Sequence, residues 1–160
     1  MNKHTPMKHG TLSLTRQLNA PRELVYEAWT KLEDRRHWFV GPAWTEIERS
    51  LDLRVNGQEI AHGRFEDGTE TIYTARFHLI DPNVRLIYAF DMHVAGKLFS
   101  VSLAGVEFEG KSTATELTYT ELAFFFGGEY GTESRLAGTN GLLDQFASYL
   151  ETMRRTGPRT

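Results

Sequence analysis

The chain has 160 residues, of which 40% are hydrophobic and 24% charged, and it contains no cysteine. This composition fits one ordinary globular domain and excludes disulfides, thiolate metal ligands and thiol nucleophiles. The formal net charge is only −3, without a cluster of lysines and arginines, and no apolar run approaches the roughly 20 residues of a membrane span, so neither nucleic acid nor membrane is an expected partner.

The first quarter of the chain predicts one strand and two short helices. Thr11 to Leu18 alternates apolar and polar residues, which is the period of a half-buried strand. Asn19-Ala20-Pro21 interrupts the alternation. A short helix follows, with an apolar face at Leu24, Val25, Ala28 and Trp29. A second helical turn, from Glu33 to Phe39, is predicted to end at Gly41-Pro42.

The middle of the chain, from Trp44 to Phe126, predicts a series of strands separated by turn-forming residues. Because the connections between them are short, consecutive strands are expected to be antiparallel neighbours. The predicted strands are Thr45–Leu53, Gln58–Phe65, Thr71–Ile80, Arg85–Met92, Leu98–Phe108 and Thr113–Phe125.

The last segment, Thr132 to Met153, returns to helical spacing, and its apolar face is wider than a surface helix needs. A sheet that curls around this helix would cover such a face. We therefore predict an α+β helix-grip fold, in which a curved antiparallel sheet of about seven strands surrounds a long C-terminal helix and two short helices follow the first strand. One domain is expected over residues 10–153, with flexible tails at 1–9 and 154–160.

Five segments of the sequence carry a family resemblance: 19–30 (NAPRELVYEAWT), 37–42 (HWFVGP), 52–57 (DLRVNG), 67–70 (DGTE) and 85–88 (RLIY). With the order of elements, they make the chain resemble the START/birch-pollen-allergen superfamily, often called SRPBCC, over about Thr11 to Glu151. Within it, the chain is most similar to the group named after activators of the heat-shock chaperone ATPase. The resemblance implies the fold but does not choose a function, because the superfamily includes lipid carriers, polyketide cyclases, hormone receptors and chaperone regulators.

One departure from the family pattern lies in the strand after the Asn56-Gly57 turn. Where the family usually has a large apolar residue, this chain has Glu59, followed at the same parity by the small residues Ala61 and Gly63. The resemblance implies that these three residues line the concave face of the sheet.

Strand parity places a second carboxylate, that of Glu121, on the same face, because Glu121 alternates with Leu117 and Tyr119. An ionised carboxylate is costly to bury alone. Glu59 and Glu121 are therefore expected to share a cavity as acid–base or ligand-holding groups, or to form structural ion pairs with arginines such as Arg64. The same parity argument places Tyr73, Ala75, Phe77 and Leu79 on the concave face, with Arg76 and His78 on the outer face.

No metal, cofactor or nucleophile site is predicted. His62, His78 and His93 lack the spacing of metal ligands on one strand face. The sequence has no Gly-x-Ser-x-Gly motif and no phosphate-binding glycine loop, so no residue is assigned a catalytic role.

The predicted binding site is the space between the curved sheet and the last helix, which small residues fill only in part and aromatic residues line. Trp29, Trp38 and Trp44 flank the Gly41-Pro42 turn, where the family places one mouth of its cavity. The residues assigned to ligand binding are Trp38, Glu59, Ala61, Gly63, Tyr73, Tyr88, Tyr119, Glu121 and Phe146.

The sequence favours a binding protein for an apolar or aromatic small molecule over an enzyme. One alternative is a cyclase or hydrolase with a cavity glutamate as its acid–base group. Another is a chaperone-contacting module, although chaperone activators of the family carry a further N-terminal domain that these residues lack. Residues Met1 to His9 are polar and lack the apolar run of a signal peptide, so a cytoplasmic protein is expected. The sequence does not decide between a monomer and a homodimer.

Overall fold

The computed structural model describes residues 6–111 and 113–155. Strand β1 (Lys8–Leu18) precedes two short helices, α1 (Arg22–Thr30) and α2 (Leu32–Trp38). Then come β2 (Trp44–Leu51), β3 (Gln58–Phe65), β4 (Glu70–Asp81), β5 (Arg85–Val94), β6 (Lys97–Lys111), β7 (Ala114–Phe125) and the long helix α3 (Thr132–Arg155). Both β1 and α3 extend into the segments predicted to be tails, and residues 1–5 and 156–160 of those segments lie outside the described residues. No helix in the described ranges is long and apolar enough to cross a membrane.

The seven strands form one antiparallel sheet in the order β1-β7-β6-β5-β4-β3-β2. Six of them are neighbours in both sequence and space, as their short connections predict. Between β5 and β6 the chain reverses at Ala95-Gly96, where both residues have a positive φ, of 53° and 79°, as a two-residue hairpin requires. Strand β1 instead pairs with β7, from Lys8 opposite Phe125 to Leu18 opposite Thr115.

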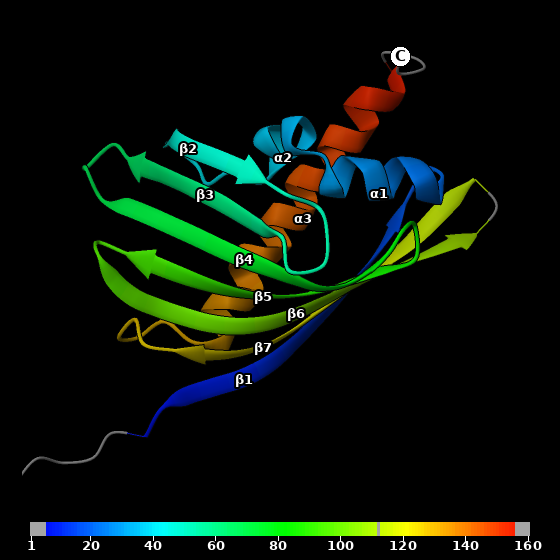
Figure 1. The fold of residues 1–160 in the computed structure, drawn as a ribbon. Helices are drawn as coiled ribbons and strands as arrows, with labels where there is room; N and C mark the ends of the chain where they lie inside the picture. The colour runs from blue at the N-terminus through cyan, green and yellow to red at the C-terminus, as the bar shows by residue number, and fades with distance from the viewer. Residues whose placement is uncertain (1–5, 112, 156–160) are drawn as a thin grey trace, which may run out of the picture.

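The sheet curves around α3, which crosses its concave face, while α1 and α2 lie beside the C-terminal half of α3 (Figure 1). Leu143, Phe146 and Leu150 on α3 are buried in the core. These residues recur on one side of the helix, and the curved sheet covers that side. The predicted helix-grip architecture, with two short helices after the first strand, is therefore confirmed.

Strand β4 departs from its predicted parity near its end. Tyr73, Ala75 and Phe77 are buried as predicted, but the register against β5 shifts between Phe77 and Leu79. This bulge turns Leu79 outward, where it is 37% exposed, and lets Ile80 pack against the core. The prediction that Leu79 lies on the concave face is therefore wrong.

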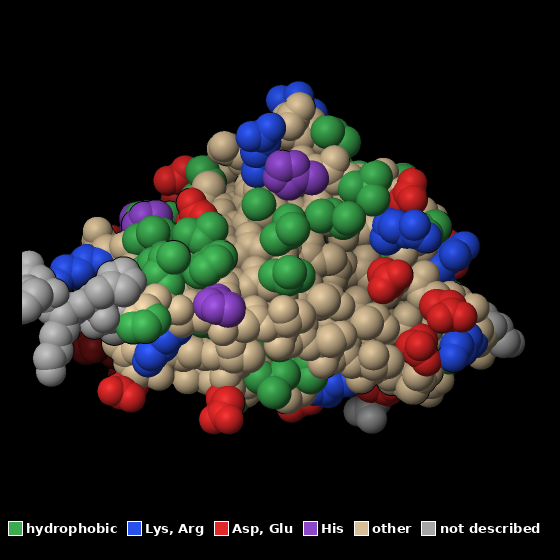
Figure 2. All heavy atoms as spheres, turned by 90° about the horizontal axis from the view of Figure 1, so that it is seen from below, with side chains coloured by type: hydrophobic (Ala, Val, Ile, Leu, Met, Phe, Trp, Pro, Cys, Tyr) green, Lys and Arg blue, Asp and Glu red, His purple; other side chains and the backbone are tan. Residues whose placement is uncertain are grey.

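The outer face of the sheet carries apolar cross-strand pairs. Val101 lies opposite Phe124 and Leu103 opposite Leu122, and all four side chains are exposed. On the face seen in Figure 2, hydrophobic side chains gather, while most of the charged side chains lie toward its edges. These residues lie on the opposite side of the sheet from α3, so they can be substituted without touching the core.

Replacing Phe146 with alanine is expected to lower the free energy of unfolding by about 3–5 kcal/mol, because a large buried ring leaves a cavity behind. The ring packs edge to face on Trp29 and Trp38, with centroid distances of 5.2 Å and 4.7 Å. Urea unfolding followed by circular dichroism measures the loss. The control Phe124→Ala, at a ring that is 44% exposed, should change stability by less than about 1 kcal/mol. An equally small effect at Phe146 would show that α3 is peripheral to the fold.

Candidate functional site

A cavity of about 540 Å³ lies between the concave face of the sheet, α3 and the segment that joins α2 to β2. Most of its lining is aromatic or aliphatic and includes all three tryptophans of the chain. The joining segment contributes Phe39, Val40, Gly41 and Pro42. The strands from β3 to β7 contribute Ala61, Phe65, Thr71, Tyr73, Tyr88, Phe90, Met92 and Tyr119. Helix α3 contributes Gly138, Thr139, Gly141, Leu142, Leu143 and Gln145.

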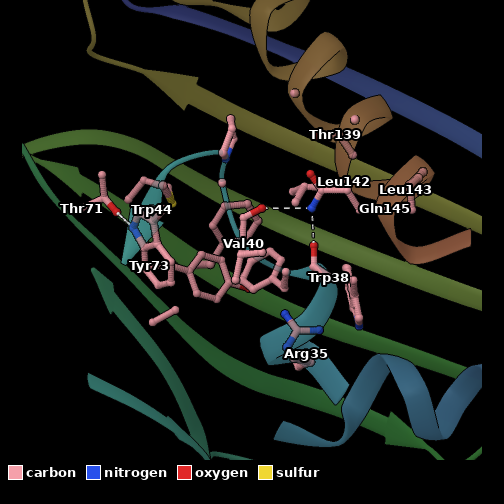
Figure 3. Close-up of a pocket in the computed structure, with 18 of the residues that line it drawn as sticks. Arg35, Trp38, Val40, Trp44, Thr71, Tyr73, Thr139, Leu142, Leu143 and Gln145 are labelled. Atoms are coloured by element: carbon pink, nitrogen blue, oxygen red, sulfur yellow. Dashed lines mark hydrogen bonds between the residues drawn. The ribbon is translucent and has the colours of Figure 1, made fainter. Parts of the chain in front are cut away.

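Small residues on β3 shape one wall of this cavity. A Cβ atom on Gly63 would lie 2.0 Å from the Trp44 indole, so only glycine lets the indole pack against β3 at this position. The Trp44 Nε1 group donates a hydrogen bond to Thr71 Oγ1 at 2.9 Å, which fixes the orientation of the ring (Figure 3). Because Ala61 on β3 is also small, the space in front of the ring stays open.

A glutamine on α3 holds the opposite wall in place. Gln145 Nε2 donates to the carbonyl oxygens of Trp38 and Val40, at 2.7 Å and 3.0 Å (Figure 3). The Trp38 indole in turn donates to the carbonyl oxygen of Ala28 at 3.0 Å. The joining segment is therefore bound to α3 and α1, although it has no regular secondary structure of its own.

Arg35 brings a guanidinium group to the α2 end of the cavity. Its Nε donates to Glu59 Oε2 at 2.5 Å and its Nη1 to the carbonyl oxygen of Trp29 at 2.7 Å. Burial disfavours the charge of Arg35 and is the largest single influence, but the attraction to Glu59, Tyr73 and Tyr88 together outweighs it, so the pKa of Arg35 is raised. This buried ion pair joins α2 to β3.

A second buried ion pair joins α3 to β7. Arg135 Nη1 donates to Glu121 Oε2 at 2.5 Å, and Arg135 Nη2 donates to Ser100 Oγ at 2.6 Å. Glu121 also accepts hydrogen bonds from Ser102 Oγ and from the Tyr119 hydroxyl, both at 2.7 Å. Both carboxylate oxygens thus have hydrogen-bonded partners, as a buried charge requires.

The structure brings five of the nine predicted site residues to the cavity: Trp38, Ala61, Tyr73, Tyr88 and Tyr119. Gly63 lies behind the Trp44 ring rather than in the lining. Phe146 is fully buried in the core, where it packs against Trp29 and Trp38, and it does not line the cavity either.

Glu59 and Glu121 are buried, as parity and the resemblance predicted, but the prediction that they share a cavity is wrong. Neither carboxylate lines the main cavity, because each is turned to its own arginine. Glu59 borders only a separate void of about 10 Å³. Arg64 is not a partner of either, since it is exposed and lies 3.6 Å from Glu70. The two glutamates therefore form structural ion pairs, as the other interpretation predicted, but with Arg35 and Arg135.

Arg35 and Arg135 were not predicted as partners of the two glutamates. Arg135 lies four residues before Thr139 and seven before Leu142, on the side of α3 that faces the sheet. A charged residue at such a position is a recognisable signal that a buried partner exists. Arg35 lies three residues before Trp38, but α2 has only 7 residues, too few for its buried side to stand out.

Within the described ranges, no group of three or more histidine or acidic side chains is placed so that it could hold a metal ion. His62, one of the histidines considered above, has its Nε2 atom 3.0 Å from Glu70 Oε1. The groups that line the cavity with polar atoms are instead guanidinium, phenol, hydroxyl and amide groups. Such groups bind an organic molecule through hydrogen bonds rather than by coordinating a metal.

Residues 19–151 match the model of the family described as Activator of Hsp90 ATPase homolog 1-like protein. Among solved structures, an uncharacterized protein from Rhizobium leguminosarum is 34% identical, with a TM-score of 0.85 over 92% of this chain and 97% of that one. A protein from Rhizobium loti is 30% identical, with a TM-score of 0.81 over 91% and 99% of the two chains. A Chromobacterium violaceum protein, 20% identical over 86% and 95%, shares the fold with a TM-score of 0.72. No curated protein matches the sequence.

Replacing Glu121 with glutamine is expected to lower the free energy of unfolding by about 3 kcal/mol, because it leaves the Arg135 charge buried without a counter-ion. Chemical denaturation measures the change. A double variant, Glu121→Met with Arg135→Met, should be more stable than Glu121→Gln because no unpaired charge is left. As a control, Asp52→Asn removes an exposed pair with Arg54 and should change stability by less than about 1 kcal/mol. Wild-type stability of Glu121→Gln would contradict a dry ion pair.

Alkaline pH is expected to destabilise the fold through Tyr73, Tyr88 and Tyr119. Burial raises the pKa of all three phenols, so the folded state disfavours their ionisation. Their folded pKa values lie above the unfolded value of about 10, so stability is unaffected below that pH and falls as pH rises further. Phenolate absorbance should therefore rise together with the loss of circular dichroism. Ionisation of all six tyrosines in a protein that still shows its native spectrum would contradict this expectation.

Proposed function

The chain belongs to the family of activator of Hsp90 ATPase homolog 1-like proteins, and we propose that it binds a mostly apolar small molecule in the cavity between the sheet and α3. The observation that carries this proposal is the cavity of about 540 Å³ with its mainly aromatic and aliphatic lining. A volume of this size and a lining with few polar groups are typical of small-molecule sites.

The arrangement of the aromatic side chains favours a ring-bearing ligand. Phe39 and Tyr73 meet edge to face at a centroid distance of 5.0 Å, and Tyr73 and Phe90 lie 5.0 Å apart in a tilted arrangement. On the α1 and α2 side, the Trp29 and Trp38 rings are 4.7 Å apart. A flat molecule in the cavity can continue these contacts, each of which adds to the gain from apolar burial.

The two alternative functions gain no support from the site. An enzyme with a glutamate as its acid–base group would need that carboxylate in the cavity, but Glu59 and Glu121 are both held by arginines. The described lining contains no carboxylate or imidazole that could take over the role. For a chaperone-contacting module, no feature of the described residues identifies a partner.

Native mass spectrometry of the purified protein tests the proposal directly, because a bound molecule adds its mass to that of the chain. In parallel, a thermal-shift screen of apolar ring compounds should find molecules that raise the melting temperature by mass action. The same molecules should change the emission of the three tryptophans, which all line the cavity. Failure of every compound to shift the melting temperature or the emission would count against a ligand-binding function.

Replacing Leu142 with tryptophan is expected to weaken binding of the strongest compound from that screen by about tenfold or more, because the larger ring occupies ligand space. Thermal-shift titration of the variant gives the affinity. Leu103→Trp is the matched control, since the same substitution on the outer face of the sheet should leave the affinity unchanged. If both variants bind as tightly as the wild type, the ligand lies outside this cavity.

A further inference from the structure

Three polar side chains at the cavity leave hydrogen-bond donors without a protein acceptor. Arg35, Tyr73 and Tyr88 all line the cavity, with exposed fractions of only 4%, 6% and 5%. Within the described part of the chain, neither tyrosine hydroxyl makes a hydrogen bond, and Arg35 uses its Nε and Nη1 atoms but not Nη2. These donor atoms are not among the fully buried polar atoms without a partner, so they are accessible from the cavity and can donate to a molecule inside it.

The three residues lie close together at the α2 end of the cavity. The Arg35 guanidinium carbon is 4.3 Å from the centroid of the Phe39 ring, which itself packs on Tyr73. Tyr73 and Tyr88 both contact Phe90, with centroid distances of 5.0 Å and 6.2 Å. The charge of Arg35 also influences the pKa of both phenols, so the three groups are close enough to interact electrostatically.

Several charged side chains are buried at this end of the cavity. Two buried guanidinium groups, Arg35 and Arg49, lie near the buried carboxylate of Glu59, and a second buried carboxylate, that of Asp34, precedes Arg35 on α2. Nε and Nη1 of Arg49 are buried without a hydrogen-bond partner in the described structure. Burial, together with repulsion by Arg35, lowers the pKa of Arg49. The nearby Arg36 and Glu46 form a pair of their own at 3.1 Å.

Both phenols keep their protons at neutral pH and therefore act as donors. Burial raises the pKa of Tyr73 and Tyr88, and Glu59 raises the pKa of each further. The positive charge of Arg35 is retained for the reason given above. This end of the cavity thus offers two neutral donors and one charged donor to a bound molecule.

On the basis of the proposed function, we propose that the ligand carries a carboxylate, which Arg35, Tyr73 and Tyr88 bind at the α2 end of the cavity. A carboxylate has two oxygens that accept several hydrogen bonds, and charge-assisted bonds of this kind are the strongest that side chains make. A neutral carbonyl oxygen would accept some of the bonds but would lack the attraction between a negative charge and the Arg35 guanidinium. The apolar part of the ligand then lies among the aromatic side chains of the remaining cavity.

Three probes of nearly the same shape separate the contributions of negative charge, hydrogen-bond acceptor and apolar rings. They are biphenyl-4-carboxylate, 4-acetylbiphenyl and 4-ethylbiphenyl. Their affinities are measured at neutral pH by titration of the tryptophan emission. The carboxylate is expected to bind about tenfold or more tightly than the ethyl compound, with the ketone between them. Equal binding of acid and ketone would overturn the anionic part of the proposal. Equal binding of all three would overturn it entirely and leave the proposed function intact, whereas binding of none would count against both.

The double variant Tyr73→Phe, Tyr88→Phe keeps the shape of the cavity and removes both hydroxyl donors. It is expected to reduce the preference for the carboxylate by about tenfold while leaving 4-ethylbiphenyl binding unchanged. Tyr26→Phe is the matched control, because it also removes one tyrosine hydroxyl but at a residue on α1 that packs on Phe108 and does not line the cavity. Its carboxylate preference should match that of the wild type. An unchanged preference in the double variant would overturn the role of the two phenols.

Discussion

The structure depends on how two carboxylates buried on the concave face of the sheet are neutralised. An ionised carboxylate without a partner in the interior would cost several kcal/mol. Glu59 on β3 is paired with Arg35 from α2, and Glu121 on β7 with Arg135 from α3. Because each arginine belongs to a different helix, the two ion pairs fix two helices against two distant strands. The cavity is the space that remains between these attachment points.

A cavity of this size persists only because its walls resist collapse, since protein interiors are otherwise closely packed. The Trp44 indole lies against Gly63 and is hydrogen-bonded to Thr71, so it cannot turn inward without breaking that bond. On the other side, Gln145 binds two carbonyl groups of the segment after α2. Polar bonds therefore hold apolar surfaces apart, which explains how a largely hydrophobic lining remains open.

Much of the fold could be predicted from the sequence because it depends on short-range patterns. Alternation identified the strands, the turn residues made them antiparallel neighbours, and the wide apolar face of the last helix required a curved cover. Parity also placed Glu121 correctly. It failed at Leu79, because the bulge before that residue shifts the register without altering the alternation of residue types.

The partners of the glutamates were harder to predict, because Arg35 is 24 residues from Glu59 and Arg135 is 14 residues from Glu121. Such pairings follow from the placement of helices on the sheet, which no local pattern encodes. Parity could nevertheless have excluded Arg64, since it lies on the same strand as Glu59 and alternates to the other face. The sequence feature that did indicate a buried partner was Arg135, a charged residue on the buried side of the last helix.

The buried polar groups of this protein fall into two kinds, and the difference between them separates stability from function. Around Glu121, both carboxylate oxygens have partners on the protein, which is what a structural network requires. At Tyr73 and Tyr88, the hydroxyls have none among the described residues, although phenylalanine at either position would bury a similar ring without that donor. A core selected for packing alone has no use for those two hydroxyls. Their position at a mostly apolar cavity instead fits the proposed binding of a polar group on an apolar ligand.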